Sequence, residues 1–373
     1  MRTLYKNLNM LYKNKTESLE FIVEDQRFVE IGKNLTAELT VDLENMLVCP
    51  GLFDIHTHGA MGYDFNMATL DEMKIIMDYY LKNGVTSVLP TIMTDDVKVI
   101  FRQLKRIFEL KKIYPSIHGI HLEGPHLAMK YKGAMPESYI LKPDLDLFKS
   151  FIEDSNHLIR LTTIAPELEN ALDLIKYAKK NNIQVTLGHS DATFDETYKA
   201  IHEGAGSFTH LFNAMRPLNH HEPGILGAAL TSNNYTEMIM DGMHLNRNTV
   251  MMLKNIRPYK KLIIVTDSIM ATGLPDGNYY LGTNKIVVKE GDARLADSNT
   301  RAGSTLNPFQ AILNFSNFTK TRLEKTVELM SINPARFMKL DHEIGSIEVG
   351  KLANFIVIDN KKLKSVYFQG RQV

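Results

Sequence analysis

The sequence predicts an α/β protein: a (β/α)8 barrel of the TIM type, with a small β-sandwich module built from both ends of the chain. Three observations support this prediction. Eight apolar runs rich in β-branched residues follow one another from residue 47 onward, segments with helical spacing or polar loops separate them, and polar side chains gather at their carboxyl ends. Eight alternations favour a barrel over a doubly wound sheet. The glycine-rich GxGxxG turn of a doubly wound dinucleotide fold does not follow the first run.

The elements can be placed along the chain in order. The strands are expected in residues 47–58, 85–94, 117–124, 159–167, 183–191, 206–215, 236–244 and 262–268. Between the first two, LDEMKIIMDYYLKNG has apolar residues at helical spacing, and its final Gly84 suits the end of a helix. The helical stretch 307–340 is expected to complete the barrel.

The two ends of the chain have a different pattern. Short alternating segments such as SLEFIVED and ANFIVIDNKKLKSVYFQG indicate small antiparallel strands. We therefore expect residues 1–48 and 346–373 to pair into the β-module and residues 49–345 to form the barrel. The turn sequences PDG and EGD predict a β-hairpin insertion near residues 273–300.

Composition limits the function classes. Lys and Arg total 43, as do Asp and Glu, so no excess charge attracts nucleic acid or an anionic membrane. The single cysteine, Cys49, excludes an internal disulfide framework and a thiolate zinc cluster. No apolar leader or membrane-spanning stretch is evident in the sequence. We therefore expect a cytoplasmic protein whose metal ligands, if any, are histidines and carboxylates.

Histidines and carboxylates do stand at the expected strand ends. His56 and His58 are two residues apart, so both side chains leave the same face of their strand and can chelate one ion. Glu123, His189 and His210 end the third, fifth and sixth strands at the same mouth. Alone, each has a structural explanation, such as a helix cap or a hydrogen-bonded core residue. Together they predict two divalent ions, one on His56 and His58 and the other on His189 and His210, with Glu123 near both.

The ion and its acid–base partner can be described in part. Such ligands suit zinc, iron, cobalt, manganese and nickel alike. Asp267 ends the eighth strand, beside the expected ions, and can also touch the first of them. A divalent ion lowers the pKa of water from ~15.7 to about 7, and a neighbouring carboxylate can take that proton and return it to a departing amine. The alternative is that Asp267 only caps the following helix.

Several motifs then resemble one family over nearly the whole chain. They are PGLFDIHTHG, GIHLEGPHL, TLGHSDA, THLFNAM, DGMHL, VTDSIMATGLPDGNY and AGSTL, and the closing GSIEVGKLANFIVID is similar to the tail of the amidohydrolase superfamily. The resemblance is to the N-acetylglucosamine-6-phosphate deacetylases. It implies hydrolysis of the N-acetyl group of a 6-phosphorylated amino sugar to acetate and glucosamine 6-phosphate. It also implies a homodimer in which the neighbouring subunit contributes to the phosphate site.

The resemblance implies substrate contacts at several loops. Asn213 and Ala214 would contact the phosphate or the sugar, and His244 the reacting end. The remaining positions implied to line the sugar pocket are Ala134, Met135, His221, Arg301, Ala302 and Gly303.

Three of these positions depart from the family pattern. His221 stands where the family has an arginine before EPG, and histidine cannot form the bidentate fork of a guanidinium with phosphate. Met135 replaces a polar histidine or glutamine, and Arg301 replaces an apolar residue. Our hypothesis is that Arg301 supplies the cation that His221 supplies poorly, or that the substrate differs from the usual one.

Other branches of the superfamily fit the sequence less well. Dihydroorotase-like and urease-like members carry a carboxylated lysine on the fourth strand, where this chain has Thr162 and Thr163. Adenosine-deaminase-like enzymes need an HxxE helix that HSDATFDE does not supply. Two alternatives stay open: a deacetylase of another N-acetyl amino sugar, such as N-acetylgalactosamine 6-phosphate, and a non-catalytic protein that binds a sugar phosphate on the same barrel.

Overall fold

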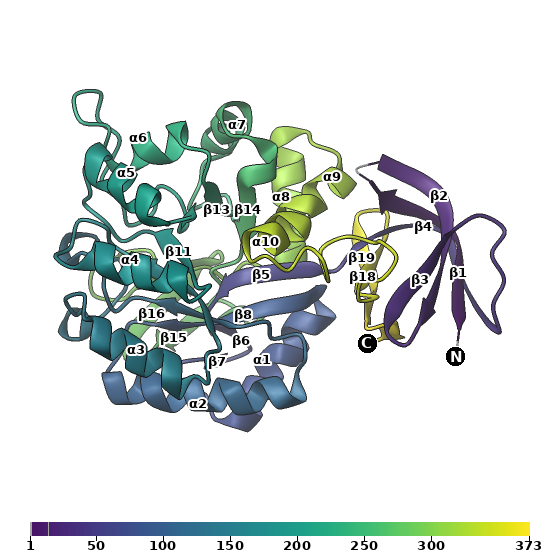
Figure 1. Ribbon diagram of the computed structural model, residues 1–373, viewed down its shortest axis with the longest axis horizontal. Helices are drawn as coiled ribbons and strands as arrows, with labels where there is room; N and C mark the ends of the chain where they lie inside the picture. Colours follow the sequence, from purple (N-terminus) through teal and green to yellow (C-terminus); the bar gives the residue numbers. More distant parts are fainter. Residues whose placement is uncertain (1, 14) are drawn as a thin grey trace.

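The computed structural model describes residues 2–13 and 15–373. It consists of a barrel surrounded by helices and a smaller β-module at one side, where both termini lie (Figure 1). The predicted fold class, a (β/α)8 barrel with a β-sandwich from both termini, is confirmed.

Eight parallel strands form the barrel in chain order. They are β5 (Leu52–Thr57), β8 (Val85–Met93), β9 (Ile120–Glu123), β10 (Ile159–Ile164), β11 (Gln184–Leu187), β12 (Ser207–Phe208), β13 (Tyr235–Ile239) and β14 (Leu262–Val265). Each pairs in parallel with its neighbours. The first and last strands meet at their carboxyl ends, where the backbone N–H of Asp267 donates to the carbonyl of His56 at 2.9 Å. The circle therefore closes beside the predicted metal ligands.

A helix follows each strand. The helices are α1 (Leu70–Lys82), α2 (Val97–Ile113), α3 (Leu145–Asp154), α4 (Ala171–Lys180), α5 (Phe194–Glu203), α6 (Gly224–Thr231), α7 (Arg247–Ile256) and α8 (Pro308–Thr319). Thr69 and Glu72 form a capping box that starts α1. The same helix stops at Lys82, and Gly84 then takes a φ of 93°, which suits glycine. The predicted end of this helix is thus observed.

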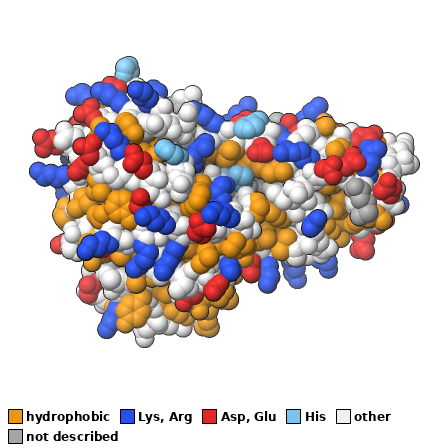
Figure 2. Space-filling view, turned by 60° about the horizontal axis from the view of Figure 1, so that its bottom comes forward, with side chains coloured by type: hydrophobic (Ala, Val, Ile, Leu, Met, Phe, Trp, Pro, Cys, Tyr) orange, Lys and Arg blue, Asp and Glu red, His pale blue; other side chains and the backbone are white. Residues whose placement is uncertain are grey.

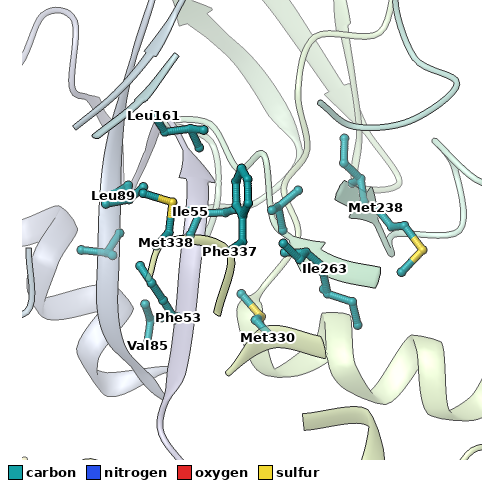
Figure 3. Packing of buried hydrophobic residues seen from close by; sticks show 14 of the residues in the cluster. Phe53, Ile55, Val85, Leu89, Leu161, Met238, Ile263, Met330, Phe337 and Met338 are labelled. Carbon is teal, nitrogen blue, oxygen red and sulfur yellow. The ribbon is translucent and has the colours of Figure 1, made fainter. Parts of the chain in front are cut away.

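Apolar side chains plug the amino end of the barrel. Short α9 (Leu323–Val327) and α10 (Ile332–Phe337) follow α8, and Phe337 packs on Tyr235 at the start of β13 with ring centroids 5.1 Å apart. Figure 3 shows Phe337 and Met338 beside Ile55 and other barrel residues. Because hydrophobic side chains fill this end, access to the barrel interior is from its carboxyl end.

The β-module has its own core. Its sheet follows the order β20-β19-β18-β4-β1-β2-β3. Its strands are β1 (Thr3–Tyr12), β2 (Lys15–Glu24), β3 (Arg27–Gly32), β4 (Leu39–Pro50), β18 (Phe355–Asp359), β19 (Lys362–Phe368) and β20 (Arg371–Gln372). Aromatic rings dominate the core: Phe355 lies 4.4 Å from Tyr367 and 5.2 Å from Phe21, centroid to centroid. Both ends of the chain therefore contribute to one packed unit.

Three predicted elements differ in detail. The first strand, expected over 47–58, is divided at Gly51: the residues before it belong to β4 of the module. A Cβ at Gly51 would lie 2.1 Å from Oγ1 of Thr86, so only glycine allows this close crossing. The strand expected over 206–215 is limited to β12, because the chain turns at once after Phe208. The insertion has three antiparallel strands rather than a hairpin: β15 (Gly277–Leu281), β16 (Asn284–Lys289) and β17 (Asp292–Leu295).

The predicted division of the chain into a β-module of residues 1–48 and 346–373 and a barrel of residues 49–345 stays a prediction.

The face of the molecule in Figure 2 carries Lys and Arg side chains interspersed with Asp and Glu, as the formal net charge of zero leads one to expect. Across residues 2–13 and 15–373, every helix is too short or too polar to span a bilayer.

Candidate active site

The predicted metal ligands lie at the carboxyl ends of the barrel strands. His56 lies in β5 and Glu123 ends β9, whereas His189, His210 and Asp267 each lie two residues beyond β11, β12 and β14. These last three have φ values of 49°, 24° and 49°. Residues other than glycine rarely adopt such values, and strained residues of this kind concentrate at functional sites. The bends turn the side chains inward from the ends of the strands.

The ligand atoms form two groups, each with its atoms within 4.8 Å of one another. In the first group, Nε2 of His58 lies 3.1 Å from Oδ1 of Asp267, and Nε2 of His56 lies 3.6 Å from it. In the second, Nε2 of His189 and Nε2 of His210 lie 3.2 and 3.3 Å from Oε1 of Glu123. We call the six residues together the metal cluster.

Glu123 joins the two groups. Its Oε2 lies 3.3 Å from Nε2 of His58, while its Oε1 faces His189 and His210 and lies 3.4 Å from Nε2 of His56. The carboxylate can therefore share its two oxygens between two ions. Glu123 thus lies between the two pairs of histidines, and the number of ions stays a prediction.

The donor set fits divalent cations. Ions of the zinc type bind imidazole nitrogen and carboxylate oxygen at ~2.0–2.2 Å, which places neighbouring ligand atoms of a tetrahedron roughly 3.3–3.6 Å apart. Nε2 of His189 lies 3.2 Å from Nε2 of His210, so two nitrogens of the same kind face each other. Nε2 of His56 is buried and has no hydrogen-bond partner among the described residues. A cation between these atoms would satisfy all of them.

When no cation is bound, the electrostatics of the site favour the protonated form of His58 and the ionised form of Asp267. Burial lowers the pKa of His58, but its hydrogen bonds to Asp267 and Glu123 outweigh burial and raise the pKa to about 9. Burial acts the other way on Asp267, yet the neighbouring His56 and His58 hold its pKa at about 2. A metal ion must displace protons from these imidazoles, so its affinity depends on pH.

Glu237, which no sequence pattern singled out, orients the cluster. This fully buried residue of β13 has its Oε2 3.1 Å from Nδ1 of His56, and the same oxygen accepts the backbone N–H of His210 at 3.3 Å. A carboxylate on Nδ1 fixes the histidine tautomer and directs Nε2 toward a metal. The signal in the sequence was a single acid in the otherwise apolar TEMIM. Similarly, Nδ1 of His189 lies 2.9 Å from the carbonyl oxygen of Tyr131.

A buried hydroxyl network holds Asp267 from behind. The hydroxyl of Thr266 donates to Oδ2 of Asp54 at 2.6 Å, and the hydroxyls of Ser268 and Tyr80 are hydrogen-bonded to each other. The backbone N–H of Ser304 donates to the carbonyl of Asp267 at 2.8 Å. These contacts fix the segment on both sides of Asp267, so its carboxylate has a defined position.

Apart from His56, the residues of the metal cluster form the floor of a pocket with a volume of about 630 Å³. Of the predicted substrate residues, those that line it are Ala134, Met135, Asn213, Ala214, His244, Arg301 and Gly303. Ala302 is fully buried and His221 is exposed, and neither belongs to the lining. The structure thus brings seven of the nine predicted positions to one cavity.

The polar residues of the pocket wall are held in place. Nδ2 of Asn213 donates to the carbonyls of His210 and Leu211 at 3.1 and 3.2 Å, which leaves its Oδ1 for a ligand. Nδ1 of His244 lies 2.6 Å from Oδ2 of Asp241, an acid that sequence reasoning also missed although it stands three residues earlier in DGMH. Held in this way, His244 can present Nε2 to the pocket.

The apolar part of the wall combines Met93 and Met135 with Leu281 of the insertion. Met135 is 5% exposed and packs with Met93 and with Leu281 of β15. Gly303 has a φ of 58°, and a Cβ there would lie 2.5 Å from Cγ2 of Ile269 and 2.9 Å from the carbonyl oxygen of Asp267. Only glycine fits at this position beside Asp267.

The chain is similar to known proteins over most of its length. An N-acetylglucosamine-6-phosphate deacetylase of Lysinibacillus sphaericus is 32% identical over 355 residues, which is 94% of this chain and 91% of the relative. An N-acetylgalactosamine-6-phosphate deacetylase of Escherichia coli O157:H7 is 33% identical over 330 residues, 87% of each chain.

Solved structures of N-acetylglucosamine-6-phosphate deacetylases are also similar to this chain. The crystal structure of N-acetylglucosamine-6-phosphate deacetylase from Pasteurella multocida superposes with a TM-score of 0.95 at 28% identity, covering 100% of both chains. A mutant of the Mycobacterium smegmatis enzyme, in complex with N-acetyl-D-glucosamine-6-phosphate, gives 0.93 at 29% identity, covering 100% of this chain and 98% of the other. The profile of the amidohydrolase family matches residues 47–373. The chain therefore belongs to the amidohydrolase family.

Proposed function

We propose that the protein hydrolyses the N-acetyl group of N-acetylglucosamine 6-phosphate to give acetate and glucosamine 6-phosphate. The observation that carries this proposal is the position of the metal cluster, with Asp267, at the floor of a pocket of about 630 Å³. Relatives that are 32–33% identical over most of the chain carry this activity or its galactosamine counterpart in their names.

Each group of the metal cluster would hold one divalent ion, so we propose two per subunit: His56, His58 and Asp267 on one side and His189 and His210 on the other, with Glu123 shared. When bound, such ions polarise the amide carbonyl and activate water for attack. Zinc, iron, cobalt, manganese and nickel all suit these ligands.

Asp267 has the proton-transfer role. Its Oδ1 lies 3.1 Å from Nε2 of His58, beside the atoms that would hold an ion, so the carboxylate is placed to accept the proton of the attacking water. The carboxylate then delivers this proton to the amide nitrogen as the carbon–nitrogen bond breaks. Water thereby contributes its oxygen to acetate and a proton to the amine, and Asp267 returns to its starting state.

The other pocket residues would position the sugar. Asn213 and His244 line the cavity, and neither Oδ1 of Asn213 nor Nε2 of His244 has a hydrogen-bond partner within the described part of the chain. Both atoms can therefore hydrogen-bond sugar hydroxyls or the acetyl carbonyl. Met135 provides an apolar surface instead of the polar group usual in the family. We further propose a cytoplasmic homodimer, with zinc as one candidate ion.

Acetate release from purified, metal-analysed protein tests the proposal. The substrates are the 6-phosphates of N-acetylglucosamine and N-acetylgalactosamine and both unphosphorylated sugars. We expect the highest kcat/KM for N-acetylglucosamine 6-phosphate. The galactosamine alternative is favoured by the Escherichia coli relative and would be supported by the opposite order. Absence of acetate release from all four sugars by metal-loaded protein would refute a deacetylase and favour the binding-protein alternative.

A further inference from the structure

The pocket rim contains several cations, and most are already neutralised. Arg301 uses three nitrogens: Nε and Nη2 contact the two oxygens of Asp292 at 2.7 and 2.9 Å, and Nη1 donates to the carbonyl of Met243 at 3.1 Å. Such a bidentate pair occupies the fork that a phosphate would need. The guanidinium of Arg301 is therefore engaged before any substrate arrives.

Two other candidates are also poorly placed. Nζ of Lys132 lies 3.7 Å from a carboxylate oxygen of Glu137 and donates to the carbonyl of Met135 at 3.4 Å. The exposed His221 packs on His220 with ring centroids 3.9 Å apart and lies outside the pocket lining. Lys132 therefore has a carboxylate partner of its own, and His221 does not line the cavity within this chain.

A third group of charges is different. Nζ of Lys130 lies 2.9 Å from Oδ2 of Asp191, and Nε of Arg216 lies 2.7 Å from Oδ1 of the same carboxylate. Two cations thus share one anion, which leaves a net positive charge. The two terminal NH2 groups of Arg216 make no hydrogen bond with any residue in the described ranges 2–13 and 15–373. We call Lys130, Asp191 and Arg216 the cationic clamp.

The clamp is fixed relative to the floor of the pocket. The backbone N–H of Ala128 donates to the carbonyl of His189 at 2.9 Å, and the N–H of Arg216 donates to the carbonyl of Ser190 at 3.0 Å. The segments that carry the clamp are therefore pinned to the chain that follows β11 and carries His189. Lys130 lines the cavity together with Asn213 and Ala214, whereas Arg216 lies outside the lining and is linked to Lys130 through Asp191.

Glu222, a further carboxylate near the clamp, is hydrogen-bonded to backbone N–H groups. The charge of Glu222 reaches Arg216, but its Oε1 accepts the backbone N–H groups of Phe194 and Gly224, both at 3.1 Å. This carboxylate caps two helix starts, so its charge is engaged largely by backbone donors.

We propose that Lys130 and Arg216, held together by Asp191, bind the 6-phosphate of the substrate in place of the arginine that His221 replaces. This inference rests on the proposed function. The acetamide would lie at the metal cluster and the phosphate at the clamp, at opposite ends of one hexosamine. A guanidinium with both terminal NH2 groups available matches two phosphate oxygens, and the Lys130 ammonium adds a second charge.

Steady-state kinetics of acetate release tests the clamp. Arg216→Met and Lys130→Met keep the apolar stems and remove the charges. We expect each to lower kcat/KM for N-acetylglucosamine 6-phosphate by roughly 10- to 100-fold, mainly through KM, as for other hydrogen-bonded charge pairs. For unphosphorylated N-acetylglucosamine, kcat/KM should change by less than about twofold, since no phosphate is present to bind.

The experiment includes a control variant, Arg102→Met, and a variant of the alternative anion site, Arg301→Met. Arg102→Met, on the exposed side of α2, should leave both substrates unaffected. If Arg301→Met lowers activity on the phosphorylated sugar while Arg216→Met and Lys130→Met do not, the clamp proposal is wrong and Arg301 is the anion site. Equal losses on both sugars in the clamp variants would also overturn the proposal, because they would indicate general damage to the pocket.

Direct binding separates this inference from the proposed function. Calorimetric titration with glucosamine 6-phosphate and with glucosamine needs no turnover. We expect Arg216→Met to weaken only the phosphorylated ligand, with metal content and circular dichroism unchanged. If the wild-type protein releases no acetate but shows this difference, the activity fails and the clamp stands. If Arg216→Met binds glucosamine 6-phosphate as the wild type does, the clamp fails whatever the activity.

Discussion

The floor of the pocket consists of side chains at the ends of barrel strands, whereas the rim consists of side chains that leave longer loops. On the floor, Glu123 is 2% exposed and His189 is 4% exposed. At the rim, the side chain of Lys130 is 67% exposed and that of Arg301 is 27% exposed. Substitutions of the buried floor residues are therefore expected to lower catalytic activity strongly. At the exposed rim, one cationic side chain can take the place of another.

Removal of the proton acceptor should have the largest effect. In Asp267→Asn the side chain keeps its size but cannot accept a proton, so we expect kcat to fall by about 10³-fold with little change in KM. Acetate release and elemental analysis, measured together, check this. A loss of activity explained entirely by missing metal would show that Asp267 acts only as a ligand.

Metal removal should reverse the pH dependence of stability. Without a cation, the pKa of His58 is raised from 6.5 to about 9, so its contribution is fully present below about pH 6.5 and is lost as the pH rises through 9. The contribution is at most on the order of 3 kcal/mol. Chelator-treated protein should therefore have a lower Tm at high pH, whereas metal-loaded protein should not.

Thermal unfolding of both forms across this pH range provides the measurement. Metal affinity should rise over the same interval, because fewer protons compete for the imidazoles. Parallel Tm curves for the two forms would show that the imidazoles do not compete with the metal.

The carboxylate behind His56 should matter less than the ligands themselves. Glu237→Gln keeps the shape but weakens the hold on Nδ1, and we expect metal affinity to fall by about 10- to 100-fold. Competition with a metal indicator measures it. Glu328→Gln is a matched control, since Glu328 is 5% exposed and is paired with Lys325 far from the cluster in sequence. Equal affinities for Glu237→Gln and the wild type would exclude the orienting role.

The smallest effect is expected at the rim. Arg301→Met breaks the pair with Asp292, whose side chain is 21% exposed. Because partly exposed ion pairs contribute little, the free energy of unfolding should fall by no more than about 1 kcal/mol. Urea denaturation tests this. A much larger loss would mean that the rim is as constrained as the floor.

The difference between the floor and the rim of the pocket also explains which features could be predicted from the sequence. The position of His56 and His58 follows from strand periodicity, and the other predicted ligands stand where a predicted strand ends. Local sequence and barrel topology were therefore sufficient to predict that these side chains lie together. At the rim, most of the positions that the family motifs implied do line the pocket. The hydrogen bonds and ion pairs that these residues form could not be predicted. The ion pair between Arg301 and Asp292 depends on how β17 and the following loop fold together.

Errors at the element level have related causes. The run over 47–58 looks like one strand because apolar residues continue through Gly51, and only the contact with Thr86 reveals the crossing from module to barrel. The run over 206–215 keeps its apolar character beyond β12 because Leu211 stays buried after the chain has turned. Hydrophobicity reports burial, and burial does not distinguish a strand from a buried turn.

The sequence by itself determined the barrel, the module from both ends, and the residue types of the metal cluster, because periodicity and strand order are local properties that add up along the chain. Only the tertiary structure decided that Glu237 supports His56 and that Asp191 joins Lys130 to Arg216. These contacts join residues that are between 25 and 181 positions apart in the chain. Their energies depend on atomic distances that no local pattern encodes.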